Sequence, residues 1–188
     1  MRQCGAVSTK AYIALGSNLG DRRSHLRDAV RRLSELPQTC VTSVSPVYET
    51  APVGPEGQGP YLNAAVGVST RLDATALRRA LVQIEDASGR DRSVPRWGPR
   101  TLDMDLLLFG SQRVETDELT VPHPRMHERW FVLRPLCDIA PDARVPGTGH
   151  EGAGRSVAEL LERVEPDALA RPPEALVDAV PTPSGSQP

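Results

Sequence analysis

The stretch that decides the fold is RWGPRTLDMDLLLFG, residues 96–110. Its second half, DMDLLLF, has the length and the apolar run of a strand that is buried along most of its length. Asp103 and Asp105 stand at positions i and i+2, so on a strand both carboxylates leave the same face, with their Cα atoms about 7 Å apart. Because three leucines follow at once, these acids lie at the edge of a core, where unpaired charges are costly.

Two convergent carboxylates suit a hard cation, and magnesium in particular prefers one or two carboxylates together with water and substrate phosphate. The alternative for a bare DxD pattern is a solvent-facing pair at the start of a strand. The buried run that follows Asp105 favours the metal interpretation. The sequence contains no GxxxxGK[ST] motif, which excludes a P-loop nucleotide site.

Outward from this strand, apolar periodicity predicts the order strand, helix, strand, strand, helix, strand. The expected strands are Ala11–Gly16, about Cys40–Tyr48, Tyr61–Thr70 and Asp103–Phe109. The expected helices carry Leu26, Val30 and Leu33 before Pro37, and then span about Asp73–Ala87. This order predicts an α+β fold, a ferredoxin-like βαββαβ antiparallel sheet with helices packed on one face.

A C-terminal helical extension is expected after the sheet, with helices at about Met126–Leu136 and Val157–Val164. Residues 1–165 then form one domain. Residues 166–188 are rich in proline and poor in bulky apolar groups, so we expect a disordered tail there.

Composition narrows the class of protein. The chain has 188 residues, a net charge of −2 and a pI near 6.1, so nothing attracts it globally to nucleic acid or to an anionic membrane. No apolar run is long enough to span a bilayer and the first residues lack a signal-peptide core, so we expect a cytoplasmic protein. Three widely spaced cysteines predict neither a disulfide framework nor a zinc pair.

Arginines cluster just before the acid pair, at Arg90, Arg92, Arg96 and Arg100. Guanidinium forks suit phosphate oxygens, although a solvated loop that uses arginine for solubility is the alternative. Metal carboxylates beside cationic forks favour transfer of a phosphoryl or pyrophosphoryl group, in which positioning and charge stabilisation dominate catalysis.

Other polar and aromatic residues lie close to these loops. His123 and His127 have zinc-like spacing, but Pro122 and Pro124 make a shared helical face improbable, so His123 better fits a donor to phosphate. Tyr61, Trp97 and Phe131 border the polar loops and suit stacking on a flat heterocycle. Asn63 could read such a ring through its paired donor and acceptor.

Five motifs in this order and spacing resemble the 6-hydroxymethyl-7,8-dihydropterin pyrophosphokinase family of folate biosynthesis, over about residues 11–141. They are ALGSNLGDR, SPVYETAPVG, YLNAAV, RWGPRTLDMDLLLFG and LTVPHPRMHERWFVL. The resemblance implies a monomer that moves the pyrophosphoryl group of ATP to the hydroxymethyl oxygen of the pterin and releases AMP, with two Mg2+ ions.

The resemblance also implies residue roles. Asp103 and Asp105 would hold both metal ions, and Arg90 and Arg92 would belong to a catalytic loop that closes over the triphosphate. The implied nucleotide contacts are Glu85, Arg92, Trp97, Arg100, Leu106, Thr120, His123 and Arg129. The implied pterin contacts are Thr50, Pro52, Val53, Tyr61, Asn63, Trp97 and Phe131.

Three positions depart from the family pattern. Ser93 and Glu118 stand where many members carry a basic residue, so we expect a weaker grip on triphosphate or different loop dynamics, without loss of activity. Pro124 stands where some members have an aromatic residue.

Two other functions fit parts of the pattern. A single-strand nucleic-acid module would need a positive net charge and aromatics on the central strands, and the sequence indicates neither. A metal-dependent phosphohydrolase would leave Tyr61, Asn63 and Phe131 unexplained.

Overall fold

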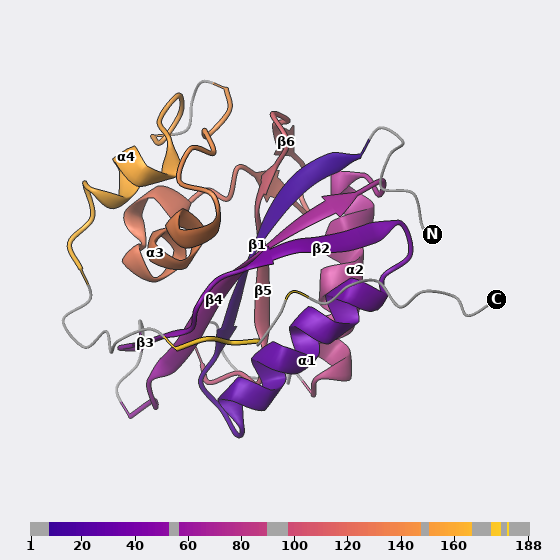
Figure 1. Ribbon diagram of the computed structural model, residues 1–188, viewed down its shortest axis with the longest axis vertical. Helices are drawn as coiled ribbons and strands as arrows, with labels where there is room; N and C mark the ends of the chain where they lie inside the picture. Colours follow the sequence, from indigo (N-terminus) through magenta and orange to yellow (C-terminus); the bar gives the residue numbers. More distant parts are fainter. Residues whose placement is uncertain are drawn as a thin grey trace.

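An antiparallel sheet forms the centre of the molecule (Figure 1). The computed structural model describes residues 8–52, 57–89, 98–147, 151–166, 174–177 and 180. The strands of the sheet are β1 (Thr9–Ser17), β2 (Thr39–Val44), β3 (Tyr48–Thr50), β4 (Tyr61–Thr70) and β5 (Asp103–Phe109). Their order is β2-β4-β1-β5, and β3 also pairs with β4. The prediction that helices pack on an antiparallel sheet is confirmed.

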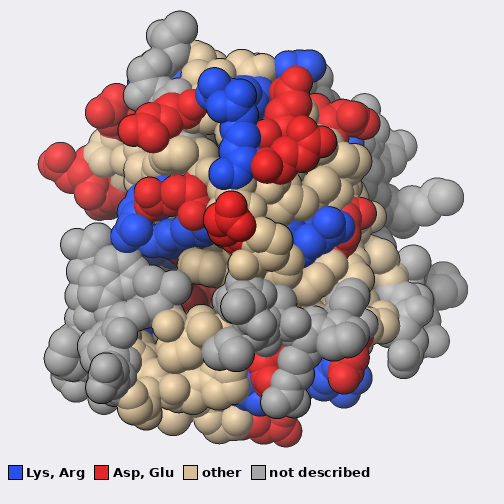
Figure 2. All heavy atoms as spheres, turned by 90° about the vertical axis from the view of Figure 1, so that its left-hand side faces the viewer, with Lys and Arg blue, Asp and Glu red and all other residues tan. Residues whose placement is uncertain are grey.

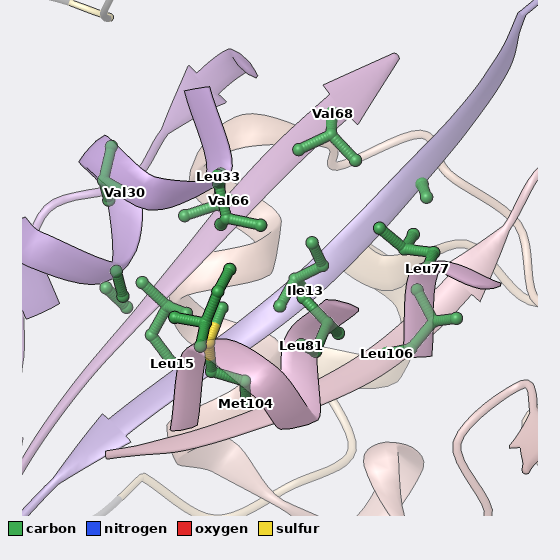
Figure 3. Packing of buried hydrophobic residues seen from close by; sticks show 14 of the residues in the cluster. Ile13, Leu15, Val30, Leu33, Val66, Val68, Leu77, Leu81, Met104 and Leu106 are labelled. Carbon is green, nitrogen blue, oxygen red and sulfur yellow. The ribbon is translucent and has the colours of Figure 1, made fainter. Parts of the chain in front are cut away.

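Two long helices, α1 (Arg22–Glu35) and α2 (Ala74–Ala87), cover one face of this sheet. Each begins at an aspartate whose side chain accepts a hydrogen bond from the backbone of the first turn, Asp21 for α1 and Asp73 for α2. Their apolar stripes meet the odd-numbered side chains of β1, such as Ile13, in the main core (Figure 3). Both helices therefore lie where apolar periodicity predicts them.

The C-terminal helices cover the opposite face. The two helices of the βαββαβ unit share one face as predicted, and the prediction had assigned no face to the C-terminal extension. A 3-10 turn at Met126–Glu128 leads into α3 (Trp130–Ile139), which packs with α4 (Val157–Leu161) in a second core. Since alternate residues of a strand point to opposite faces, Tyr12 and Ala14 of β1 pack against this second core. A small hairpin of β6 (Val114–Glu115) and β7 (Thr120–Val121) precedes it.

The strand predicted over Cys40–Tyr48 is in fact two strands that share one edge of β4. The interruption lies at Ser45, whose backbone N–H donates to the carbonyl of Ala65 at 2.9 Å and whose Oγ accepts from the Ala65 N–H at 2.8 Å. β2 then pairs with the second half of β4 and β3 with its first residues. After this break the chain continues as β3, which contributes Thr50 to the site described below.

Four residues of the segment expected to be disordered, Glu174–Val177, pack against α1 and the start of β3. Glu174 and Val47 exchange backbone hydrogen bonds of 2.8 and 3.2 Å. Arg23 and Arg27 donate to the carbonyls of residues 175 and 176, and Leu176 is 1% exposed within the main core. The expectation of disorder does not hold for these four residues. No helix in the described ranges has the length and hydropathy that a membrane span requires.

Candidate active site

A cavity opens on the face of the sheet that carries α3, beside the end of β1 and the start of β5. It encloses about 690 Å3, counting its open mouth. Figure 2 looks onto this face, where basic and acidic side chains are mixed and acidic atoms are visible in a recess near the centre. The described residues that line the cavity are Ala14, Leu15, Gly16, Thr50, Ala51, Tyr61, Asn63, Arg100, Asp103, Asp105, Arg129, Phe131 and Val132.

Gly16 of β1 sets the layout of the cavity floor. In the sheet register Gly16 faces Asn63 of β4 on one side and Asp103 of β5 on the other. A Cβ atom at position 16 would lie 3.4 Å from Oδ1 of Asn63, 3.7 Å from Cδ1 of Tyr61 and 3.9 Å from Cβ of Asp103. Because glycine has no side chain, the cavity stays open between the end that holds the Asn63 amide and the end that holds the Asp103 carboxylate. These are called the amide end and the carboxylate end below.

The carboxylate end is a pair of acids with cationic neighbours. Asp103 Oδ1 accepts from Nη1 of Arg100 at 3.1 Å, and Oδ2 of Asp105 lies 3.8 Å from Nε2 of His123. Burial, followed by the charge of Asp103, raises the pKa of Asp105. Ionising both acids is therefore costly in the free protein, and a bound cation would relieve that cost.

These residues fit magnesium. The described part of the chain holds no group of three or more His, Cys, Asp or Glu side chains that could bind a metal. Magnesium does not need such a group, because it retains water and takes phosphate oxygens as ligands beside one or two carboxylates. Asp103 and Asp105 are the carboxylates that would hold it.

Cationic groups stand beside the acids. Burial, followed by the charge of Arg125, lowers the pKa of Arg129, and burial lowers the pKa of His123. His123 is fixed from the sheet, because its backbone N–H donates to the carbonyl of Leu107 at 2.9 Å. An anion such as a phosphate group would offset the cost of burying the Arg129 guanidinium and would favour the protonated form of His123.

The amide end of the cavity is built by β3, β4 and the start of α3. Nδ2 of Asn63 donates to Oγ1 of Thr50 at 2.8 Å, and both side chains are almost fully buried. The guanidinium carbon of Arg129 lies 5.7 Å from the ring centre of Phe131, so Phe131 joins the aromatic and cationic parts of the wall. With Tyr61 also in the lining, this end can bind a flat polar ring.

Asn18 is a residue whose role the sequence did not predict. Its Oδ1 accepts from the backbone N–H of Arg100 at 2.8 Å, and its own N–H donates to the Arg100 carbonyl at 3.1 Å. Its Nδ2 donates to Oε1 of Gln58 at 3.1 Å. The turn GSNLGD at the end of β1 therefore fixes the backbone of Arg100. The only sequence signal for this role was the presence of an Asn in that turn.

The structure brings together most of the residues singled out from the sequence. Those that line the cavity are Thr50, Tyr61, Asn63, Arg100, Asp103, Asp105, Arg129 and Phe131, and His123 lies beside Asp105. Glu85 and Leu106 are buried in the core, and Thr120 is exposed on β7, so the lining includes none of these three. Pro52 is also outside it. Val53, Arg90, Arg92, Arg96 and Trp97 lie outside the described residues.

One argument against a nucleic-acid module needs correction. Two aromatic residues do stand on the central strands, Tyr12 on β1 and Tyr61 on β4. Tyr12 packs against the second core, and Tyr61 lines the cavity, so neither forms an open stacking surface.

Paired acids, guanidinium groups and a cavity with aromatic walls on an antiparallel α/β sheet define a phosphotransferase type of site. The family model described as 7,8-dihydro-6-hydroxymethylpterin-pyrophosphokinase (HPPK) matches residues 12–141, and the chain belongs to this family.

Relatives and solved structures agree with this assignment. The chain is 51% identical over 141 residues to a 2-amino-4-hydroxy-6-hydroxymethyldihydropteridine pyrophosphokinase of Bacillus subtilis, which covers 75% of this chain and 84% of the relative. It is 42% identical over 166 residues to the enzyme of that name from Pseudomonas aeruginosa, with 88% and 98% covered. A crystal structure of Plasmodium falciparum HPPK-DHPS matches with a TM-score of 0.62 at 15% identity, which shows a shared fold. The match covers 84% of this chain and 43% of that chain.

Proposed function

We propose that this chain transfers the pyrophosphoryl group of ATP to the hydroxymethyl oxygen of 6-hydroxymethyl-7,8-dihydropterin, giving AMP and the pterin diphosphate in folate biosynthesis. The observation that carries the proposal is the register across β1, which sets Asn63 and Asp103 on either side of Gly16. An amide end suited to a pterin thereby adjoins a carboxylate end suited to a metal-bound triphosphate. Membership of the pyrophosphokinase family supports the same reaction.

The pterin binds at the amide end in this proposal. Its ring lies between Tyr61 and Phe131, and Asn63 reads its polar edge. Because the Thr50 hydroxyl already accepts one Asn63 N–H, the amide is held in one orientation before the substrate arrives. Backbone at Thr50, Pro52 and Val53 completes this part of the site.

The triphosphate binds at the carboxylate end. Arg100, His123 and Arg129 contact its oxygens, with Arg90, Arg92 and Trp97 closing over it. Of the residues implied on the nucleoside side, Thr120 is exposed, whereas Glu85 and Leu106 are buried in the core and would act from behind the site. Magnesium held by Asp103 and Asp105 would neutralise charge on the phosphate oxygens. Support comes from the buried cations and acids of the free protein, which gain from opposite charge.

The chemical step forms one bond and breaks one. The hydroxymethyl oxygen attacks the β-phosphorus of ATP and loses its proton, while the bond from the β-phosphorus to the bridging oxygen of the α-phosphate breaks and AMP leaves. Arg100 and Arg129 stabilise the negative charge that the phosphate oxygens carry during transfer. Asn63 and the aromatic walls hold the attacking oxygen in line by fixing the ring.

Finer features belong to the same proposal. We expect two magnesium ions, a monomer, small-molecule partners without nucleic acid or membrane, and a single pyrophosphokinase domain over residues 1–165. The order β2-β4-β1-β5, with α1 between β1 and β2 and α2 between β4 and β5, supports the ferredoxin-like topology. The helices α3 and α4 form the C-terminal extension.

The test is AMP formation from ATP with and without the hydroxymethyl pterin. We expect AMP only when both are present, and we expect Asp105→Asn to fold but to lose magnesium-dependent turnover by at least about a hundredfold. Asp117→Asn, an exposed acid of the β6–β7 turn, is the matched control and should behave as the wild type. Pterin-independent release of phosphate would indicate a hydrolase instead.

A further inference from the structure

The backbone of Met104, the residue between the two site acids, is held by side chains of α2. Its N–H donates to Oε1 of Glu85 at 2.8 Å, and its carbonyl accepts from Nη1 of Arg78 at 3.4 Å. Its side chain is fully buried and lies in the main core beside Leu15, its partner in the sheet register (Figure 3). Residue 104 is therefore fixed through its side chain and through both backbone polar groups.

The position of β5 in the sheet explains this arrangement. β5 stands at one end of the strand order, next to β1. In an antiparallel pair, alternate residues direct their backbone groups at the partner strand, and the residues between them direct theirs away. The bonds of Met104 to α2 show that it belongs to the second kind, so the backbone groups of Asp103 and Asp105 face β1 at Gly16 and Ala14.

Glu85 and Arg78 form one unit on α2. They are seven residues apart, which places them two turns apart on the same face of the helix. Glu85 is 0% exposed, and its Oε2 lies 3.8 Å from Nη1 of Arg78. A buried carboxylate is tolerated only when it is hydrogen-bonded and paired, and the Met104 N–H together with Arg78 meets this requirement.

We propose that Glu85 and Arg78 are positioning residues that aim the two site acids into the cavity. The N–H of Met104 belongs to the peptide group that joins residues 103 and 104, and its carbonyl belongs to the peptide group that joins 104 and 105. Rotation of either peptide would swing one aspartate, so fixing both sets the spacing and direction of the carboxylates. The inference rests on the proposed function, and it gives Glu85 a role behind the site in place of a direct contact with the nucleoside.

The test measures metal affinity apart from turnover. Free Mn2+ is followed by electron paramagnetic resonance with each variant and a saturating non-hydrolysable ATP analogue. We expect Glu85→Leu to weaken Mn2+ binding by about tenfold, the lower end of what loss of a supporting residue behind metal ligands costs. Glu85→Gln keeps an oxygen that can accept the Met104 N–H and should retain most of the affinity.

Arg78→Met keeps the apolar stem of the side chain and should weaken Mn2+ binding less than Glu85→Leu, in the same direction. Arg79→Met is the matched control, since Arg79 is the next residue of α2 and its side chain is 70% exposed. It should bind Mn2+ as the wild type does. For all four variants we expect the KM for ATP at saturating magnesium to stay near the wild-type value.

Wild-type Mn2+ affinity in a folded Glu85→Leu would overturn the proposal. Should Glu85→Leu fail to fold, Arg78→Met decides, and an unchanged affinity there would also overturn it. A raised KM for ATP with unchanged Mn2+ affinity in Glu85→Gln would make Glu85 a nucleotide contact instead. If the variants weaken Mn2+ binding as expected but the wild type makes no AMP from ATP and the pterin, the proposed function fails and the positioning role stands.

Discussion

Replacement of Leu176 by Ala tests whether the docked segment Glu174–Val177 contributes to stability. The change removes three carbon groups from a side chain that is 1% exposed in the main core. At about 0.8 kcal/mol per group, the lost transfer free energy is about 2.4 kcal/mol. A residual cavity would add to this value, as it does for leucines inside rigid cores.

Undocking of the segment limits the total cost. The segment is held by the backbone pair with Val47 and by Arg23 and Arg27, so it can detach locally once Leu176 no longer anchors it. The mutation cannot cost more than the docking itself contributes. We therefore expect the free energy of unfolding to fall by about 2–3 kcal/mol.

Urea unfolding followed by tryptophan fluorescence measures this loss. Val180→Ala is the matched control, because it shortens an apolar side chain of the same tail that is 38% exposed. The control should stay within about 0.5 kcal/mol of the wild type. If Leu176→Ala changes the midpoint no more than the control does, the segment is not docked in solution and the reasoning is refuted.

Two further predictions concern the site. Gly16→Ala should leave the free energy of unfolding within about 1 kcal/mol of the wild type, because the new methyl group meets only ordinary contacts with Asn63, Tyr61 and Asp103. It should nevertheless raise the KM for the pterin, since the methyl group fills the cavity floor, and an unchanged KM in steady-state kinetics would contradict the assigned layout. Arg92→Ala, outside the described residues, should lower kcat more than it weakens ATP binding measured by calorimetry. The proposed function assigns Arg92 to a loop that would contact the triphosphate mainly in the transition state. Equal losses in both would make Arg92 a plain binding residue.

Much of the fold could be predicted from local sequence patterns. The features that were not predicted depend on contacts between residues far apart in the chain. The helices α1 and α2 lie where they were predicted, because capping and apolar periodicity act within a few residues. The break at Ser45 depends instead on bonds to Ala65, twenty residues away in the chain. The local signal for such a break is Pro46, the next residue, which has no N–H to donate to a strand ladder, and the prediction of one strand did not use it.

The second face of the sheet was missed for a related reason. Small or aromatic residues such as Ala14 and Tyr12 alternate with the apolar residues of β1, and this pattern fits a strand buried on both faces as well as one. Leu176 was missed because a lone leucine among prolines carries no periodicity. Only the assembled α1 surface shows where it packs.

For the site, the sequence indicated which kinds of side chain take part better than it indicated how they are arranged in space. Asp103, Asp105 and the arginines are recognisable because charges at the edge of an apolar run need an explanation. Gly16 and Ala14 carry no functional group, so their role as the floor becomes apparent only from the register across β1. The hold of α2 on Met104 was likewise hidden, since it uses backbone groups that every residue has.

The central place of β1 also sets the order of events during synthesis. Of the described strands of the sheet, β1 comes earliest in the chain, and it pairs Thr9 with Thr70 on one side and Ala11 with Phe109 on the other. The second partner appears about a hundred residues after the first strand, a delay of about 5–20 s at typical rates of translation. Both edges of this apolar strand are open until β4 has been made, and one edge stays open until β5 follows. The strand that forms the floor of the site is therefore made before its partners in the sheet, and its pairing is completed only when β5 has been made.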